Sequence, residues 1–402
     1  MENKSPSPGP LAGLKILEMG QLIAGPFCAR LMAEFGAEVI KIEPPESGDP
    51  LRTWRKLHKG TSLWWYAQGR NKKSITVNLK SPEGQDIVRK LAAKADIVIE
   101  NFRPGALEKW NLGYEQLAKD NPGLIMVRLS GFGQTGPYRD RLGFGAIGES
   151  MGGMRYVTGY PDRAPVRVGI SLGDSLAAMY GVMGALMALH HRNVNGGKGQ
   201  VVDVALYEAV FSMMESMLPE FGMNGFIRER TGASLPGIVP SNTYETRDGK
   251  YVVIGANGDS IFKRLMRAIG RADLAEDPTV ADNAGRVAKT EELDRVIGEW
   301  TRANNLDHVL DTLEKAEVPG AKIYSIADIV ADMHYQARGM IEKNKLSDEE
   351  DLLLPGIVPK LSATPGKTRW IGPKLGQHTA EVLAEIGIDA EQLSQLKSKG
   401  VL

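Results

Sequence analysis

Short apolar segments and amphipathic helical segments alternate through the first third of this 402-residue chain. Strands are predicted between Gly13 and Ser130 by the segments GLKILEM, AEVIKIE, KSITVNLK, DIVIENF and LIMVRLS, with helical segments such as GPFCARLMAEFG between them. Strands that alternate with helices in this way form a parallel sheet with helices on both faces. We therefore predict an α/β fold with a Rossmann-like large domain, whose ligand binds where the strands end.

A second region begins near Phe226, where Gly, Pro and polar turns become frequent. The segment TYETRDGKYVVIGA predicts a β-hairpin with an Asp-Gly turn, and helices are expected around SIFKRLMRAIG and TEELDRVIGEWTRAN. We predict residues 1–200 as the first part of the large domain, 201–225 as a linker, 226–323 as a smaller α+β domain, and 324–402 as a linker that returns to the large domain.

The charge balance disfavours nucleic acid as a partner. Lys and Arg together number 49, Asp and Glu also number 49, and no long basic run occurs. The single cysteine, Cys28, cannot form an internal disulfide, and its apolar helical setting predicts a buried thiol rather than a nucleophile. The polar N-terminal segment MENKSPSPGP has no apolar centre, so we predict no signal peptide and expect a cytoplasmic protein.

The long apolar segment Leu176–Leu189 is shorter than the roughly 20 residues that a membrane-spanning helix needs. It also contains Gly181 and Gly184. We therefore predict a buried core helix, whose glycines let another backbone approach, and no membrane association.

Several common cofactor and metal motifs do not occur in the sequence. The first strand-to-helix turn, MGQLIAGP, lacks the G-x-G-x-x-G spacing of dinucleotide sites, so Glu43 at the end of the next strand is interpreted as a solvated strand end. No H-E-x-x-H, paired C-x-x-C or G-x-S-x-G occurs either. We expect no metal site, no nicotinamide and no permanently bound cofactor.

Cationic side chains gather near two of the predicted strand ends. They are Arg70, Lys72, Lys73 and Lys80 around the strand KSITVNLK, and Arg103 and Lys109 after the strand DIVIENF. Cations at strand ends and helix starts are what a phosphorylated ligand needs. Surface lysines without a specific role are the alternative.

One carboxylate, Asp174, stands at the head of the apolar segment in VGISLGDSLAAMYGVMGALMALHHR. Gly-Asp-Ser ahead of a helix is a common N-cap, in which Asp or Ser accepts backbone hydrogen bonds. The same position suits a nucleophile, because a helix N-terminus favours the ionised form of a carboxylate. The sequence is compatible with both roles.

Seven segments in the same order identify a family. They are LAGLKILEMGQLIAGPFCARLMAEFGAEVIKIEPPESGDPLR, RNKKSITVNLKSPEG, ADIVIENFRPGALEKWNLGYEQL, LSGFGQTGPY, LGDSLAAMYG, GKGQVVDVALYEAV and LGQHTAEVL. Through them the chain resembles the class III CoA-transferases, the CaiB/BaiF group that includes formyl-CoA transferase, carnitine CoA-transferase and succinyl-CoA:dicarboxylate CoA-transferases. The resemblance covers nearly the whole chain and implies CoA transfer between an acyl-CoA and a carboxylic acid.

The resemblance implies that Asp174 is the catalytic nucleophile, which forms an aspartyl anhydride and then an aspartyl-CoA thioester. It implies that CoA is contacted by Gln21, Ile23, Ala24, Val77, Asn78, Leu79, Lys80, Asn101, Phe102, Arg103 and Lys109. Trp54 matches an aromatic side chain beside the reacting centre of formyl-CoA transferase. The family also forms an interlocked homodimer in which each chain threads through the other.

Three departures from related enzymes bear on the substrate and the reaction. Pro44 stands where formyl-CoA transferase carries an arginine against the nucleotide, so that contact is absent or supplied elsewhere. The run of consecutive glycines in that enzyme has no counterpart, which disfavours formate and oxalate as substrates. Phe144 and Gly145 stand where α-methylacyl-CoA racemases carry His and Asp, so a racemase would lack one of its two proton-transfer groups.

The segment GFGAIGESMGGMRYVTG resembles the one in members that act on dicarboxylates. A buried distal carboxylate needs a cation, and the candidates are Arg52, Arg155 and Arg167. We therefore expect CoA transfer from succinyl-CoA to a small di- or hydroxycarboxylic acid. The alternatives are an α-methylacyl-CoA racemase of the same fold and a non-catalytic CoA-binding protein.

Overall fold

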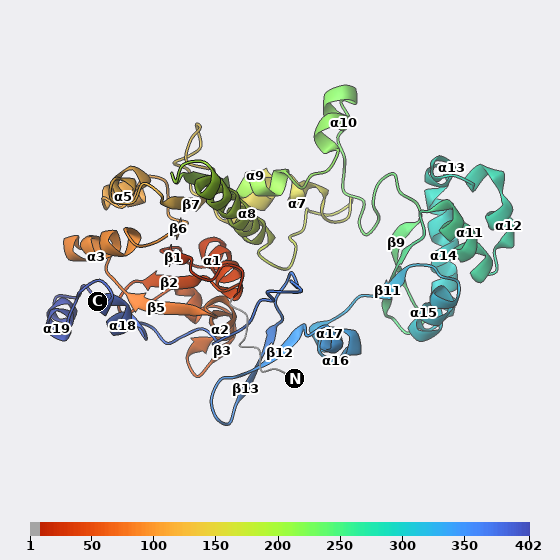
Figure 1. The fold of residues 1–402 in the computed structure, drawn as a ribbon. Helices are drawn as coiled ribbons and strands as arrows, with labels where there is room; N and C mark the ends of the chain where they lie inside the picture. Colours follow the sequence, from red (N-terminus) through yellow and green to blue (C-terminus); the bar gives the residue numbers. More distant parts are fainter. Residues whose placement is uncertain (1–8) are drawn as a thin grey trace. The chain divides into compact units, whose positions relative to one another are not determined.

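Six parallel strands form the central sheet, in the order β5-β2-β1-β6-β7-β8, in a computed structural model that describes residues 9–402 (Figure 1). Every neighbouring pair in this sheet is parallel, which confirms the prediction from the alternating segments. The strands are β1 (Lys15–Glu18), β2 (Glu38–Glu43), β5 (Lys72–Thr76), β6 (Ile97–Glu100), β7 (Ile125–Ser130) and β8 (Val201–Ala205).

Alternate residues of these strands face two separate apolar cores. Ile16 belongs to one core and its neighbour Leu17 to the other. The first core lies under α1 (Ala24–Glu34), α8 (Leu172–Val194) and α9 (Leu206–Phe211), and the second under α3 (Pro82–Ala92), α5 (Tyr114–Asp120) and α18 (Thr379–Ala384). Burial on both faces explains why these strands are continuous apolar runs without a polar alternation.

The chain divides into two units. Among the described residues, the first comprises 9–154 together with Val168–Phe226 and Arg338–Leu402. Besides the sheet and its helices, this unit holds the short elements η1 (Pro50–Thr53), β3 (Leu57–His58), β4 (Thr61–Ser62), α2 (Leu63–Gln68), α4 (Ala106–Lys109), α6 (Gly145–Met151), α10 (Met217–Asn224), β12 (Ile341–Lys345), β13 (Asp351–Pro355) and α19 (Ala390–Ser398). The element α7 (Met154–Val157) straddles the boundary between the units.

The second unit comprises Arg155–Arg167 and Ile227–Ala337. Its antiparallel sheet has the order β11-β10-β9, and the predicted hairpin is confirmed in β9 (Ser241–Glu245) and β10 (Tyr251–Gly255), with β11 (Gly320–Lys322) beside β10. Its helices are α11 (Asp259–Ala268), α12 (Ala272–Glu276), η2 (Pro278–Val280), α13 (Asn283–Ala288), α14 (Thr290–Ala303), α15 (Leu306–Lys315), α16 (Ile326–Ala331) and α17 (Met333–Ala337). Amphipathic α11 and α14 bury Phe262 and Leu293 in a core of their own.

Three segments depart from the predicted domain boundaries. Residues 201–225 are not a linker, because they supply β8, α9 and α10 of the first unit. Arg155–Arg167 belongs to the second unit, and that unit continues beyond residue 323 through α16 and α17 to Ala337. The pairing of β8 with β7 joins residues about 75 positions apart in the chain, and a local pattern does not encode such a pairing.

The helix α8 is only partly a core helix. Its glycines allow close approach as predicted, since a side chain on Gly181 would meet the Sγ atom of Cys28 and one on Gly184 would meet Val202. Its opposite face is exposed at Met179, Met183 and other apolar residues, so the prediction of a buried helix was wrong for that face. By length and composition alone α8 could also cross a membrane, but its glycine face packs on the central sheet.

We expect Cys28 to resist thiol reagents in the folded protein. Its side chain is fully buried, and burial, reinforced by Glu18, raises the pKa of the thiol to about 12. Alkylation by iodoacetamide, followed by mass spectrometry, should be negligible in native buffer and complete in guanidinium chloride. Rapid alkylation of the native protein would contradict a buried structural role.

Candidate functional site

A pocket of about 640 Å³ opens at the carboxyl ends of β1, β2, β5 and β6, the edge of a parallel sheet where ligands bind. Segments that follow these strands form most of its wall, and the end of the chain beyond α19 completes it. The lining residues are Met19, Gln21, Ile42, Glu43, Pro44, Pro45, Glu46, Ser47, Val77, Asn78, Leu79, Lys80, Phe102, Trp110, Lys397, Gly400 and Leu402.

Six of the predicted CoA contacts line this pocket: Gln21, Val77, Asn78, Leu79, Lys80 and Phe102. Because β5 ends at Thr76, the residues from Val77 to Lys80 form a loop at the pocket rather than the end of a strand. Two predicted contacts, Ile23 and Ala24, do not line the pocket, because they are buried at the start of α1.

The predicted contact Asn101 holds the first loop instead of lining the pocket. Its Oδ1 accepts from the N–H of Gln21 at 2.7 Å and its Nδ2 donates to the carbonyl of Gln21 at 2.9 Å. Three other side chains fix the same loop by hydrogen bonds. Lys41 donates to the carbonyl of Gly20, Asp49 accepts from the N–H of Leu22, and Gln68 donates to the carbonyl of Ile23. They hold Leu22 in the left-handed region at φ 64°, a strained conformation that only its surroundings can maintain.

A second pocket, of about 330 Å³, adjoins the first at Trp110, which lines both. Arg103 and Lys109, the remaining predicted CoA contacts, line this second pocket. Arg103 donates to the carbonyl of Asp140 at 3.0 Å, and the ring of Phe102 meets Trp110 edge to face at 5.4 Å. The two pockets thus join an apolar wall to exposed cations, an arrangement that suits a ligand with phosphates and an aromatic base.

The other cations at these strand ends line neither of the two pockets. Arg70 and Lys72 are buried and form ion pairs with Glu34 and Glu18. Lys73 pairs with Glu38 at 2.9 Å on the side of β5 that faces α18. The hypothesis that these three cations bind phosphate was wrong, because carboxylates of α1 and of the sheet already neutralise them.

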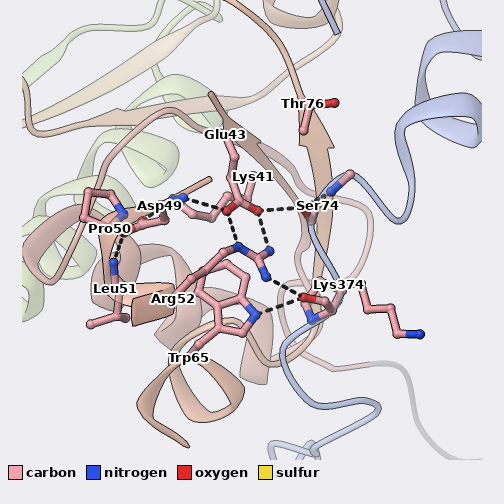
Figure 2. A network of polar contacts seen from close by, with 12 residues as sticks. Lys41, Glu43, Asp49, Pro50, Leu51, Arg52, Trp65, Ser74, Thr76 and Lys374 are labelled. Carbon is pink, nitrogen blue, oxygen red and sulfur yellow. Dashed lines mark hydrogen bonds and ion pairs between the residues drawn. The ribbon is translucent and has the colours of Figure 1, made fainter. Parts of the chain in front are cut away.

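A buried charge cluster lies directly beneath the first pocket. The Nζ of Lys41 contacts Glu18 at 2.8 Å and Asp49 at 2.9 Å, and Glu43 accepts from the backbone N–H of Asp49 at 2.9 Å. Figure 2 shows Glu43 among Asp49, Arg52 and Ser74, whose hydroxyl donates to it at 2.6 Å. Glu43 is therefore a fully buried member of an ion-pair network, and its interpretation as a solvated strand end was wrong.

Arg52 belongs to the same network. Its guanidinium donates to both carboxylate oxygens of Glu43, at 2.7 and 2.8 Å, and stacks on the ring of Trp65 at 3.7 Å. This side chain is committed to a structural partner, which argues against its use for a substrate carboxylate. Trp54 directly follows η1 and is 41% exposed, so the network leaves its ring accessible.

The carboxylate of Asp174 lies in the first turn of α8 but is not its N-cap. The helix begins at Leu172, the N-cap position is Ser171, and the side chain of Ser171 makes no capping hydrogen bond. The carboxylate lies against the backbone of Gly145, the first residue of α6, where a Cβ atom would come within 2.8 Å of its Cγ. Gly145 does not have a positive φ, so a glycine is required here for space and not for backbone conformation.

We expect Gly145→Ala to lower kcat on the order of 100-fold with little change in KM. The added methyl group overlaps the Asp174 carboxylate and must displace it, and a displacement of about 1 Å costs roughly that factor in rate. Gly298→Ala is the matched control, because Gly298 also lies in a helix and a Cβ there meets only the end of the Arg302 side chain, at 3.4 Å. A Gly145→Ala enzyme with the wild-type kcat in steady-state assays would show that the packing has no role in turnover.

Two features of the site had no signal in the sequence. Glu149 of α6 is a buried carboxylate whose Oε1 accepts from the backbone N–H of Gly173 at 3.3 Å, next to Asp174. Lys397 and the residues that follow it reach the first pocket from the far end of the chain. Neither lies in a recognisable motif, and long-range packing alone brings them to the site. Of the other predicted substrate residues, Arg155 and Arg167 belong to the second unit.

Comparison with known proteins identifies the family. A family model described as CoA-transferase family III matches residues 11–379. The chain is 51% identical over 397 residues to succinyl-CoA–D-citramalate CoA-transferase of Chloroflexus aurantiacus, with 98% of each chain covered. It is 43% identical over 398 residues to the beta subunit of succinyl-CoA–L-malate CoA-transferase of the same organism, again with 98% of each covered.

A solved structure supports the same relationship. The crystal structure of a CaiB/BaiF family protein from Brucella suis superposes with a TM-score of 0.83 at 35% identity, covering 94% of this chain and 100% of that chain. The resemblance inferred from the seven segments is thereby confirmed. The chain belongs to CoA-transferase family III.

Proposed function

We propose that the protein transfers CoA from succinyl-CoA to a small di- or hydroxycarboxylic acid, with Asp174 as nucleophile. The observation that carries the proposal is the Asp174 carboxylate in the first turn of α8, against Gly145, in a chain of this family. The donor assignment is supported by relatives named for succinyl-CoA with D-citramalate and with L-malate. Both acids are hydroxylated dicarboxylates, which agrees with the di- or hydroxycarboxylic acid expected from the sequence.

Transfer proceeds in two symmetrical halves. The Asp174 carboxylate attacks the thioester carbonyl of succinyl-CoA, the C–S bond breaks, and a mixed anhydride and CoA thiolate form. The thiolate attacks the aspartyl carbonyl, which releases succinate and leaves an aspartyl-CoA thioester. The acceptor carboxylate then attacks that carbonyl and expels the thiolate, which attacks the acceptor's acyl carbon. The products are the new acyl-CoA and the Asp174 carboxylate, with no net proton transfer.

CoA binds in the two adjoining pockets in this proposal. The wall formed by Val77–Lys80 and Phe102 holds the nucleotide, and Arg103 and Lys109 hold phosphate oxygens. Asn101, Ile23 and Ala24 act indirectly, by fixing the loop that carries Gln21. Arg155 and Arg167 stay predictions for the distal carboxylate of the acid, whereas Arg52 is paired with Glu43. Trp54 is assigned beside the reacting centre in this proposal.

The protein acts as a cytoplasmic homodimer in this proposal. One face of α8 exposes apolar side chains, among them Met179, Met183 and Met187, and α10 adds Leu218 and Phe221. A contiguous exposed apolar patch on a protein surface commonly marks a site of interaction with another protein. An interlocked second copy of the chain is the proposed occupant, and multi-angle light scattering that gave the monomer mass would refute it.

The alternatives are a racemase and a non-catalytic CoA-binding protein. Phe144 and Gly145 stand where α-methylacyl-CoA racemases carry His and Asp, so the second proton-transfer group of those enzymes is missing at these positions. Neither alternative needs a carboxylic acid acceptor. The racemase would exchange the α-proton of a 2-methylacyl-CoA in deuterated water, whereas the binding protein would transfer nothing.

The deciding experiment assays purified protein with succinyl-CoA, acetyl-CoA and butyrobetainyl-CoA against citramalate, malate, glutarate, mesaconate and carnitine. We expect turnover with succinyl-CoA and the dicarboxylates only. Incubation with succinyl-CoA and hydroxylamine should convert Asp174 into a hydroxamate that peptide mass spectrometry detects. Turnover restricted to monocarboxylate or carnitine pairs would overturn the substrate assignment, and an unmodified Asp174 would overturn the mechanism.

A further inference from the structure

The C-terminal segment forms one wall of the first pocket. The helix α19 begins with a capping box made by Asp389 and Gln392, which fixes its start. Beyond its end, the carbonyl of Val401 accepts from the backbone N–H of Asn78 at 2.8 Å, and the Val401 side chain is buried in the core beneath the sheet. The segment between these two anchors, which includes Lys397, is thus held beside the Val77–Lys80 loop.

Lys397 brings an uncommitted cation to this wall. Within residues 9–402 its ammonium group has no ion pair or hydrogen bond, and its side chain lines the pocket. Lys399, two residues further on, instead pairs with Glu83 at 3.3 Å and does not line it. A cation in the last turn of a helix also interacts favourably with the helix dipole, which is the alternative explanation for the position of Lys397. That explanation does not account for its position at the pocket.

The order of the strands indicates which part of CoA reaches Lys397. The nucleophile is on α8, which packs on β7 and β8 at one side of the sheet, whereas Lys397 stands beside the loop after β5, the strand at the opposite edge. The thioester must reach Asp174, so the nucleotide end of CoA lies toward β5. Arg103 and Lys109 follow β6, an inner strand that lies between β5 and β7 in the sheet order, so we assign the pyrophosphate to the second pocket, which they line.

The part of the pocket wall at the end of β2, from Ile42 to Ser47, provides no cation. Pro44 and Pro45 follow β2 there, and a proline has neither a charge nor a backbone N–H to offer. A ribose phosphate between that wall and α19 therefore depends on Lys80 and Lys397 for charge neutralisation. We infer that Lys397 binds the ribose 3′-phosphate of CoA, an inference that rests on the proposed use of this pocket for CoA.

The test compares two variants and two ligands by isothermal titration calorimetry. Lys397→Gln should weaken binding of CoA on the order of tenfold, the effect of one charge-assisted contact. The same variant should bind 3′-dephospho-CoA as the wild type does, because that ligand lacks the phosphate. Lys399→Gln, which removes an equal charge from the same segment, should leave both affinities unchanged, and Lys397→Arg should retain CoA binding.

The outcomes separate this inference from the proposed function. Suppose that the wild-type protein binds CoA, but Lys397→Gln changes the affinity for neither ligand or lowers both affinities equally. The 3′-phosphate assignment is then overturned, while the proposed use of the pocket for CoA stands. If the wild type binds neither ligand, the proposed function fails together with the inference. If Lys399→Gln lost as much CoA affinity as Lys397→Gln, the loss would be explained by net charge alone, and the assignment would also be overturned.

Discussion

We expect Asp174→Asn to lower kcat for CoA transfer on the order of 10³-fold or more, because an amide cannot attack the thioester. Asparagine has nearly the shape of aspartate, so it fits the same space against Gly145 and the first turn of α8 is preserved. The affinity for CoA, measured by calorimetry, should stay within about threefold of the wild-type value, because the pockets lie on other elements. Hydroxylamine trapping should be lost at the same time.

Two controls make this result specific. Asp307→Asn removes another acid from the first turn of a helix, on the exposed side of α15, and should leave kcat unchanged. Asp174→Ala guards against slow reversion of asparagine to aspartate by deamidation and should be equally inactive. An Asp174→Ala enzyme with wild-type turnover would exclude Asp174 as the nucleophile.

We expect Lys41→Met to lower the free energy of unfolding by about 3–5 kcal/mol, the cost of leaving buried carboxylates without their counter-ion. Lys41 is fully buried and contacts both Glu18 and Asp49, and it also donates to the carbonyl of Gly20 in the first loop. Chemical denaturation followed by fluorescence measures the loss. Because the first loop carries Gln21 into the pocket, the affinity for CoA should fall as well.

The matched control for this variant is Lys343→Met. Lys343 pairs with Asp351 between the exposed strands β12 and β13, where water screens both charges, so its loss should change stability little. A Lys41→Met protein as stable as this control would mean that the buried network contributes nothing to folding.

The pH dependence of the Lys41→Met effect follows from the same cluster. Burial opposes ionisation of Asp49, but Lys41 and the N–H of Leu51 outweigh it and hold the pKa of Asp49 below its ordinary 3.8. Burial also opposes the charge of Lys41, but Asp49 and Glu18 raise its pKa above 10.5. The stabilisation is therefore present between these ordinary values, is lost in acid as Asp49 protonates, and is lost in strong alkali as Lys41 deprotonates.

The sequence determined the elements whose pattern is local. The strands from Lys15 to Ser130 and the helices between them follow from apolar runs and helical periodicity, because burial on two faces leaves a continuous apolar signature. The hairpin of β9 and β10 follows from its Asp-Gly turn. Asp174 and the cations Lys80, Arg103 and Lys109 could also be proposed as site residues from the sequence, because strand ends and family motifs mark their positions.

Only the tertiary structure decided which side chains are committed to partners and which face a pocket. Arg52, Lys72 and Lys109 are all cations in short elements, yet Glu43 and Glu18 neutralise the first two, and of the three only Lys109 lines one of the two pockets proposed for CoA. The tertiary structure also decided that β8 pairs with β7, that the Asp174 carboxylate packs against Gly145, and that Lys397 lines the same pocket as Asn78. Each depends on contacts between residues far apart in the chain, and the energy of such contacts comes from burial and charge pairing that exist only after the chain has folded.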